Sequence, residues 1–168
     1  MQLLQPGQIV FGRYRVEKFL GAGGQAFGFA AHDTRAPASR PWERKVFLKQ
    51  YHDLVPSPQE LAAFDQRVTT LRDRLHEKEH YICLPKRVGT DNNSLIMIYA
   101  RVRGQTLRDW MSRGLTQPQC VRFALGLANA IRIIHKAGVI HLDLKPENAL
   151  IENVKIAKIA PTADPTLR

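Results

Sequence analysis

Apolar and polar residues alternate over short stretches in the first hundred residues, and this alternation predicts β-strands. Residues 9–33 predict two strands joined by a glycine turn at 21–24. Residues 34–45 contain two prolines and several arginines, which predict an exposed loop. Three further strands are expected at residues 45–51, 81–88 and 94–102, with a turn at 89–93 between the last two.

Two longer segments have the spacing of amphipathic helices. Ser57 as N-cap and Pro58 as first helical residue predict the start of one helix. The apolar residues that follow it share one face, which we expect to pack in the core: Leu61, Phe64, Val68, Leu71 and Leu75. A second helix is predicted from a cap at Thr116 to a stop at Gly138. Its apolar residues include Val121, Ala124, Leu125, Ala128 and Ile131, and two short strands are expected after it, at 149–151 and 154–159.

Composition and charge narrow the class of protein only a little. The 168 residues are 44% hydrophobic and 24% charged, as in ordinary globular proteins, and no apolar stretch is long enough to span a membrane. The net charge of +10 is scattered along the chain, so we expect no nucleic-acid partner, while an acidic or phosphorylated protein partner stays open. Cys83 and Cys120 lack metal-ligand spacing and the N-terminus lacks a signal peptide, which predicts reduced, buried thiols in a cytoplasmic protein.

Four polar residues at fixed spacing lie between two apolar runs near the C-terminus. His141, Asp143, Lys145 and Asn148 follow the pattern H-x-D-L-K-x-x-N, which resembles the catalytic loop of serine/threonine protein kinases. The resemblance extends over about residues 8–160 and implies an α+β, protein-kinase-like fold. It implies a five-stranded antiparallel small lobe with one helix in residues 1–101. Residues 102–168 would be an incomplete large lobe with its first helices, the catalytic loop and a short hairpin.

The resemblance also implies roles for individual residues, with ATP and Mg²⁺ as cofactors. In the catalytic loop, Asp143 would be the base, Lys145 would neutralise charge on the transferring phosphoryl group, and Asn148 would bind the magnesium ion. In the first lobe, the glycine-rich segment with Gly21 and Gly23 would cover the nucleotide phosphates. The remaining expected contacts are Lys49 with the α- and β-phosphates, backbone groups of Ala100 to Val102 with the adenine edge, and Leu150 beneath the adenine.

The glycine-rich segment departs from the family pattern in an informative way. In the ungapped register, the third glycine position falls on Ala26, and Gly28 takes the place of the usual valine that packs on the adenine. A second register puts the third glycine at Gly28 but needs a two-residue insertion. Phe47 stands where the family usually has alanine. We therefore hypothesise an exchange in which the Phe47 ring fills the space that Gly28 leaves.

Other departures bear on activity. Arg67 stands where the family has the glutamate that pairs with the strand lysine; Asp65, Glu60 or Glu77 could substitute through a shifted register. Lys158 stands at the position of the metal-binding aspartate, and Asp164 could replace that ligand if the preceding loop is longer. Leu142 replaces the arginine that reads an activation-segment phosphate, so control by such a phosphate is not expected.

Several functions remain open within this resemblance. The chain could be a pseudokinase-like binding module, an active kinase half completed by a partner or second chain, or the front part of a longer kinase. Because no later large-lobe helices follow in this sequence, the apolar face of the second long helix is expected to be partly uncovered and to recruit a protein partner. A protein would be the substrate if the chain is active. A basic, non-catalytic scaffold or interaction module using the same fold is the alternative.

Overall fold

A computed structural model describes residues 2–52, 54–75, 82–141 and 143–152, and the backbone of residues 156–159. The chain divides into two compact units, of which the first contains residues 1–66 and 85–101 and the second residues 67–84 and 102–168. Each unit is built around its own sheet. The expected lobe boundary between residues 101 and 102 stays a prediction.

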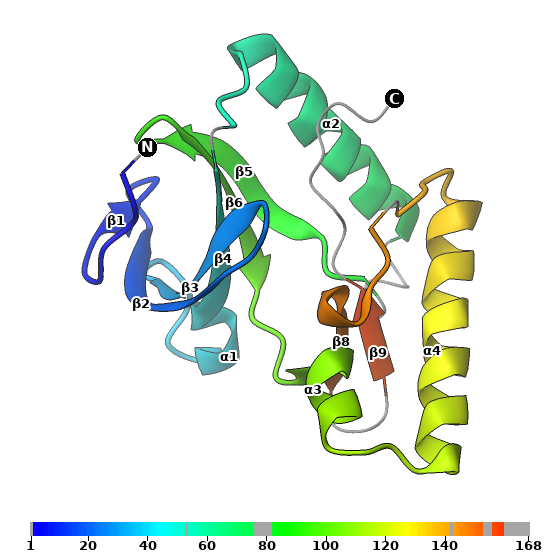
Figure 1. Ribbon diagram of the computed structural model, residues 1–168. Coiled ribbons are helices and arrows are strands. Elements are labelled where there is room, and N and C mark those ends of the chain that lie inside the picture. The colour runs from blue at the N-terminus through cyan, green and yellow to red at the C-terminus, as the bar shows by residue number, and fades with distance from the viewer. Residues whose placement is uncertain (1, 53, 76–81, 142, 153–155, 160–168) are drawn as a thin grey trace. The chain divides into compact units, whose positions relative to one another are not determined.

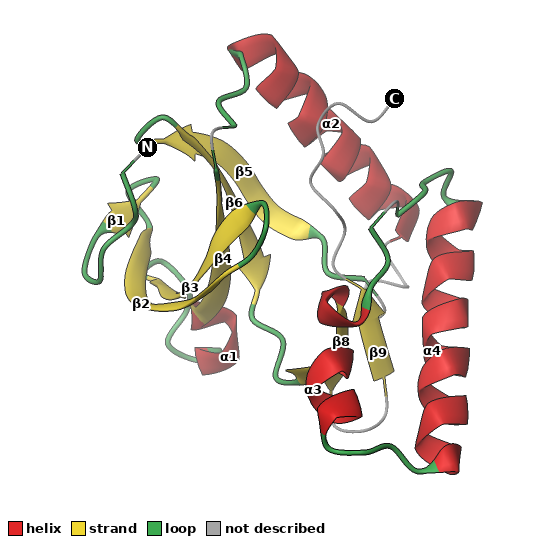
Figure 2. Ribbon diagram, viewed as in Figure 1, coloured by secondary structure: helices red, strands yellow, loops and turns green. Residues whose placement is uncertain are grey.

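The first unit contains an antiparallel sheet with the strand order β1-β2-β3-β4-β6-β5 (Figures 1 and 2). Its five longer strands are those that the alternation predicts, and the α+β fold class is confirmed. A two-residue strand, β1, is added at one edge. The strands are β1 Ile9–Val10, β2 Tyr14–Ala22, β3 Ala26–Asp33, β4 Lys45–Tyr51, β5 Pro85–Asp91 and β6 Ser94–Ala100.

One face of this sheet carries the core of the first unit. Alternate residues of the central strands, such as Phe29, Leu48 and Ile98, are completely buried there because the side-chain period of a strand is two. The N-terminal segment packs on the same core through Leu4. The buried Gln50 amide fastens this segment, since its Oε1 accepts from the Leu4 backbone N–H at 3.1 Å and its Nε2 donates to the Gln2 carbonyl at 2.7 Å.

Two connections differ in kind from what the sequence predicts. The β5–β6 turn is tighter than expected, with Asn92 and Asn93 at φ 48° and 54°, the left-handed conformation that asparagine tolerates in two-residue hairpins. Residues 34–45 are not all loop, because a short helix, α1 (Pro41–Arg44), occupies their end. Pro41 at its first position fixes a helical φ, and that signal outweighs the loop-like composition.

The second unit packs helices against a three-stranded sheet of order β7-β8-β9 (Figure 1). The expected hairpin is present as β8 (Ala149–Glu152) and β9 (Ile156–Ile159), and β7 (Gln105–Thr106) adds a third strand. The helices are α2 (Pro58–Leu75), which runs from the first unit into the second, α3 (Leu107–Ser112), α4 (Gln117–Lys136) and the 3₁₀ turn η2 (Pro146–Asn148).

The helix boundaries follow from local chemistry. Each of the three longer helices begins with a hydroxyl residue whose side chain accepts from a backbone N–H three residues on, while the residue there returns a bond; the pairs are Ser57 with Glu60, Thr106 with Asp109 and Thr116 with Gln119. At the other end of α4, Gly138 adopts φ 78°, the conformation that glycine reaches without strain. The caps predicted at Ser57 and Thr116 and the stop at Gly138 are therefore confirmed.

Helix α4 is apolar on two sides, and only one of them is buried. Its buried residues are Phe123, Ala130, Ile133 and Ile134. Ile133 and Ile134 form a cluster with Leu75 of α2 and with Ile82, while Phe123 packs with Ile151 of β8. The stripe that contains Val121 and Leu125 faces away from these clusters, with exposed fractions of 54% and 66%.

Two remaining expectations concern membranes and thiols. Within the described ranges, no helix is long and apolar enough to cross a membrane. Neither cysteine forms a disulfide in the part of the chain that the structure describes. The prediction that both thiols are buried is wrong for Cys120, which is exposed, because it lies in the first turn of α4 on the side away from the core; Cys83 is half-buried.

Candidate catalytic and nucleotide-binding residues

The catalytic-loop residues of the second unit form a connected polar cluster. The Asn148 amide nitrogen donates to the Asp143 backbone carbonyl and to Asp143 Oδ2, both at 2.9 Å. The Lys145 ammonium lies 2.9 Å from the same Oδ2. Backbone bonds from Asp143 N to His141 O and from Asn148 N to Lys145 O fix the loop. Lys145 and Asn148 therefore share the carboxylate of Asp143, which lies within five positions of both in the sequence.

The charge of this carboxylate is held by its neighbours. The hydrogen bond from Lys145 lowers the pKa of Asp143 below its ordinary value, and the bond from Asn148 acts in the same direction. Asp143 and Lys145 keep 37% and 49% of their side chains exposed. The carboxylate is thus ionised at neutral pH and accessible. It can accept a hydrogen bond from a hydroxyl and orient it, whereas its lowered pKa makes it a weak proton acceptor.

The amide of Asn148 has one end left for a metal. Its nitrogen makes both bonds to Asp143, and these two acceptors fix the orientation of the amide, so Oδ1 is the oxygen that remains. Across the residues that are described, no group of three His, Cys, Asp or Glu side chains could hold a metal ion alone. One amide oxygen beside a carboxylate fits a Mg²⁺ ion that takes most of its ligands from water and phosphate.

An ion pair supports the loop. Glu147 in η2 forms an ion pair with Arg108 of α3 at 2.8 Å, which joins the turn to the helix before it. No local pattern in the sequence indicates this pair, because its members lie 39 positions apart. Leu150 follows on β8, where alternation places it on the opposite side from the buried Ala149 and Ile151. Leu150 is half-buried and stays accessible to a ligand.

In the first unit, the strand lysine lies on the face of the sheet opposite to the core. Lys49 is directly across from Gly28 on β3 and from Met97 on β6, and Phe47 is across from Ala30 and Tyr99. Directly opposed residues share a face. We call the residues Gly28, Phe47, Lys49 and Tyr99 the lysine face. Lys49 and Phe47 are half-buried and Tyr99 is buried.

The Phe47 ring occupies the space beside Gly28, as the exchange hypothesis predicts. A Cβ atom added to Gly28 would lie 3.0 Å from both Cε2 and Cζ of Phe47, closer than carbon atoms ordinarily pack. The ring also lies 6.3 Å from the Tyr99 ring, centroid to centroid, at an angle of 46°. A larger residue at position 28 is therefore incompatible with this ring position.

The glycine-rich segment is the hairpin between β2 and β3. Gly21 pairs with Gly28, and the Gly23 N–H donates to the Ala26 carbonyl at 2.8 Å, which closes the turn. Ala100 ends β6 opposite Val46, and the next backbone N–H, that of Arg101, donates to the Lys45 carbonyl. After this strand the first unit ends at Arg101, and Val102 belongs to the second unit.

Comparison with known proteins decides the family. The family model described as "Protein kinase domain" matches residues 14–160, most of the chain. The chain belongs to the protein kinase domain family. Similar curated proteins include the serine/threonine-protein kinase pkn3 of Myxococcus xanthus, 30% identical over 87% of this chain, and a probable serine/threonine-protein kinase PknB of Bifidobacterium longum, 29% identical over 95%. This chain covers 26% and 24% of those kinases, about a quarter of their length.

Two solved structures have the same fold. PpkA-294 in its apo form gives a TM-score of 0.70 at 19% identity and matches 94% of this chain and 60% of its own. The kinase domain of Mycobacterium tuberculosis PknI gives 0.67 at 19% identity, with 98% and 66% covered. The match to protein kinases therefore extends over both units of this chain.

The structure also places the residues that depart from the kinase pattern. Arg67, at the position of the lysine-pairing glutamate, is exposed on α2, and so is Asp65. Glu60 is engaged elsewhere, since its carboxylate accepts from the Ser57 N–H and hydroxyl at 2.8 Å. The backbone of Lys158 pairs with Leu150 on β8, which places it in strand β9. Glu77, Leu142 and Asp164 lie outside the described residues.

Proposed function

We propose that this kinase-family chain binds ATP and carries the catalytic loop of a serine/threonine kinase, but transfers phosphoryl groups weakly or not at all by itself. The catalytic-loop cluster carries this proposal, because Asp143, Lys145 and Asn148 are already joined by three contacts of 2.9 Å. Lys49 would contact the α- and β-phosphates, and the backbone of Gly21 and Gly23 would cover them.

The weakness follows from two substituted positions. Arg67 carries a positive charge where the family has a carboxylate that orients the strand lysine. Lys158 replaces a metal ligand, and an ammonium group cannot ligate Mg²⁺. Phosphoryl transfer depends on positioning and charge neutralisation, so each loss is expected to lower the rate by orders of magnitude. Binding of the nucleotide is less demanding than its chemistry.

Thermal denaturation with ATP tests the binding part directly. We expect ATP with Mg²⁺ to raise the melting temperature, and ATP with EDTA to raise it by most of the same amount, because one amide oxygen from Asn148 contributes little metal affinity. Asn148→Ala should then abolish the remaining difference between the two conditions. An unchanged melting temperature in both conditions would contradict nucleotide binding. A shift that appears only with Mg²⁺ would contradict a metal-independent site.

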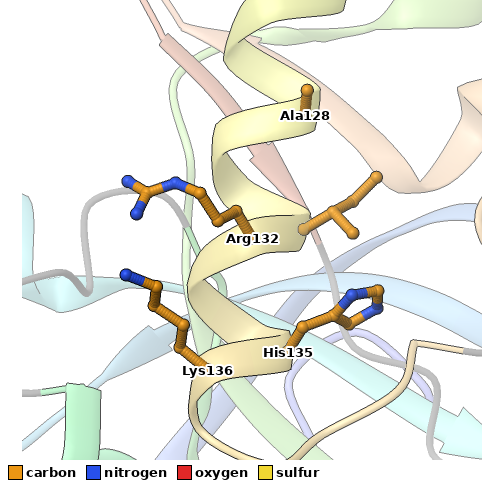
Figure 3. A pocket seen from close by; sticks show the side chains of 5 residues that line it. Ala128, Arg132, His135 and Lys136 are labelled. Atoms are coloured by element: carbon orange, nitrogen blue, oxygen red, sulfur yellow. The ribbon is translucent and has the colours of Figure 1, made fainter.

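A non-catalytic interaction module is the second candidate, and the outer face of α4 favours it. Val121 and Leu125 are exposed on this face. Further along it, Ala128 and Ile131 line a shallow hollow with three basic side chains, Arg132, His135 and Lys136 (Figure 3). Exposed apolar stripes of this kind mark interaction surfaces. We propose that a protein partner or second chain covers this face with an apolar surface that has acidic residues beside it.

Self-association of the isolated chain is the available test of this face. At 1 M salt, where the screening length is about 3 Å, the basic rim no longer separates two copies, and we expect concentration-dependent association in sedimentation velocity. Leu125→Gln should weaken that association at least about tenfold, because each leucine that is buried at the contact contributes about 1.5 kcal/mol. Arg122→Gln, on the same helix, is the matched control. A chain that stays monomeric argues against a second copy as the occupant, and association that is unchanged by Leu125→Gln argues against this surface.

The substrate of the protein is also a proposal. A protein substrate with a serine or threonine hydroxyl follows from the similarity to serine/threonine kinases, and no nucleic-acid partner is proposed because the basic residues are dispersed. The cytoplasmic location stays a prediction.

A further inference from the structure

The lysine face of the first sheet presents an aromatic ring beside the lysine. Phe47 and Lys49 are alternate residues of β4, so both project from the same side. The Phe47 ring leans toward Gly28, the residue directly across from Lys49. It is half-buried, while the apolar residues between and beside it on the strand, Val46 and Leu48, are completely buried on the other side. The ring therefore lies outside the core, on the same face of the sheet as Lys49.

The position of the ring depends on the absence of a side chain at Gly28. Even one carbon there would lie 3.0 Å from two atoms of the ring, and the ring would have to move. Tyr99 limits where it can move, because its ring lies 6.3 Å away, tilted by 46°, at the directly opposed strand position. The observed position of the Phe47 ring therefore requires glycine at position 28.

We propose that Phe47, seated over Gly28, is the residue of the lysine face on which the base ring of a bound nucleotide stacks. The inference rests on the proposed nucleotide binding and adds the residue pair that contacts the base. An aromatic ring offers a flat apolar surface to every nucleobase, and such stacking commonly changes affinity by about tenfold or more. The phosphates of the same nucleotide are assigned to Lys49.

A double-mutant cycle tests the pair. Phe47→Ala is expected to weaken ATP binding about tenfold by removing the stacking surface. Gly28→Val should weaken it as much or more and lower the melting temperature, because the valine displaces the ring. The double variant Gly28→Val/Phe47→Ala should recover most of both losses, because the new side chain then fills the space of the ring.

Two ligands and two controls assign the effect to the base. Adenosine has no phosphates, so Phe47→Ala should weaken adenosine and ATP by the same factor, whereas Lys49→Met should weaken ATP alone. Phe19→Ala is the matched control, since Phe19 is 48% exposed and pairs with Phe29 on the core side of the sheet. Titration calorimetry gives the affinities for all variants.

Each result of the cycle has one meaning. Equal losses for ATP and adenosine, with recovery in the double variant, support the stacking pair. Nucleotide affinity that rises in Phe47→Ala overturns it, since the ring would then block the base. Additive losses in the double variant overturn it too. If neither the parent nor any variant binds ATP or adenosine, both the stacking pair and the proposed nucleotide binding are wrong. The melting temperatures would then report only on the packing of Phe47 against Gly28.

Discussion

Replacing Asp143 with asparagine is expected to reduce phosphoryl transfer from ATP to serine or threonine by about 100- to 10,000-fold. In the proposed function the carboxylate orients the attacking hydroxyl, and it is the shared partner of Lys145 and Asn148. Asparagine has the same shape and can still accept from Asn148, so the fold of the loop should survive. Transfer into the chain itself and into a generic protein substrate, followed with labelled ATP, measures the effect.

The control for Asp143→Asn is Asp73→Asn, which makes the same chemical change at an exposed carboxylate on α2. We expect this variant to keep the activity of the parent. Transfer that persists unchanged in Asp143→Asn would rule out the proposed role of the carboxylate. A parent at background would remove the catalytic part of the proposal and leave nucleotide binding, which the comparison of Mg²⁺ with EDTA tests separately.

Replacing Arg13 with leucine is expected to lower the free energy of unfolding by about 2–3 kcal/mol. Arg13 Nε and one terminal nitrogen bind the two oxygens of Asp33 at 2.7 and 2.6 Å, a bidentate geometry. Asp33 is only 5% exposed, so removing the arginine leaves a buried carboxylate with only the Arg35 N–H as a bonded partner among these contacts. Urea denaturation measures the change, with Arg15→Leu, at an exposed position of β2, as the control.

The same pair predicts how stability depends on pH. The hydrogen bond from Arg13 lowers the pKa of Asp33 below its ordinary value. A carboxyl group with a lowered folded-state pKa stabilises the fold fully above its unfolded pKa, about 3.9, and this contribution is lost as the pH falls through the folded-state value. The stability difference between the parent and Arg13→Leu should therefore be complete at pH 6–7 and shrink below about pH 4. A difference that is independent of pH would contradict the ion pair as its source.

The candidate site divides into a part that the sequence predicts and a part that it does not. The spacing of His141, Asp143, Lys145 and Asn148 predicts the catalytic loop because the residues are close in sequence, and a local turn is enough to bring the last three together. The Arg108–Glu147 pair that supports the turn has no such local signal. Its distance along the chain makes it one of many possible charge pairs.

The proximity of Phe47 to Gly28 is an intermediate case. Two departures from the kinase pattern suggest that a large residue compensates for a small one. The two residues can contact each other only if the register of β3 and β4 places them on the same face of the sheet. The observed register sets Gly28 against Lys49 and Ala30 against Phe47, and the ring crosses diagonally between them. A shift of one residue would have placed Phe47 on the other face of the sheet.

The sequence alone determined the type and order of the main elements, because alternation, helical spacing and caps act over a few residues: the strands, the helices begun by Ser57 and Thr116, and the catalytic loop. Tertiary structure decided which surfaces meet. Both sides of α4 are apolar, and only packing against Leu75, Ile82 and Ile151 buries the side with Phe123 and Ile133 while Leu125 stays exposed. A helical period is the same for either side, so burial depends on long-range partners that the local pattern does not encode.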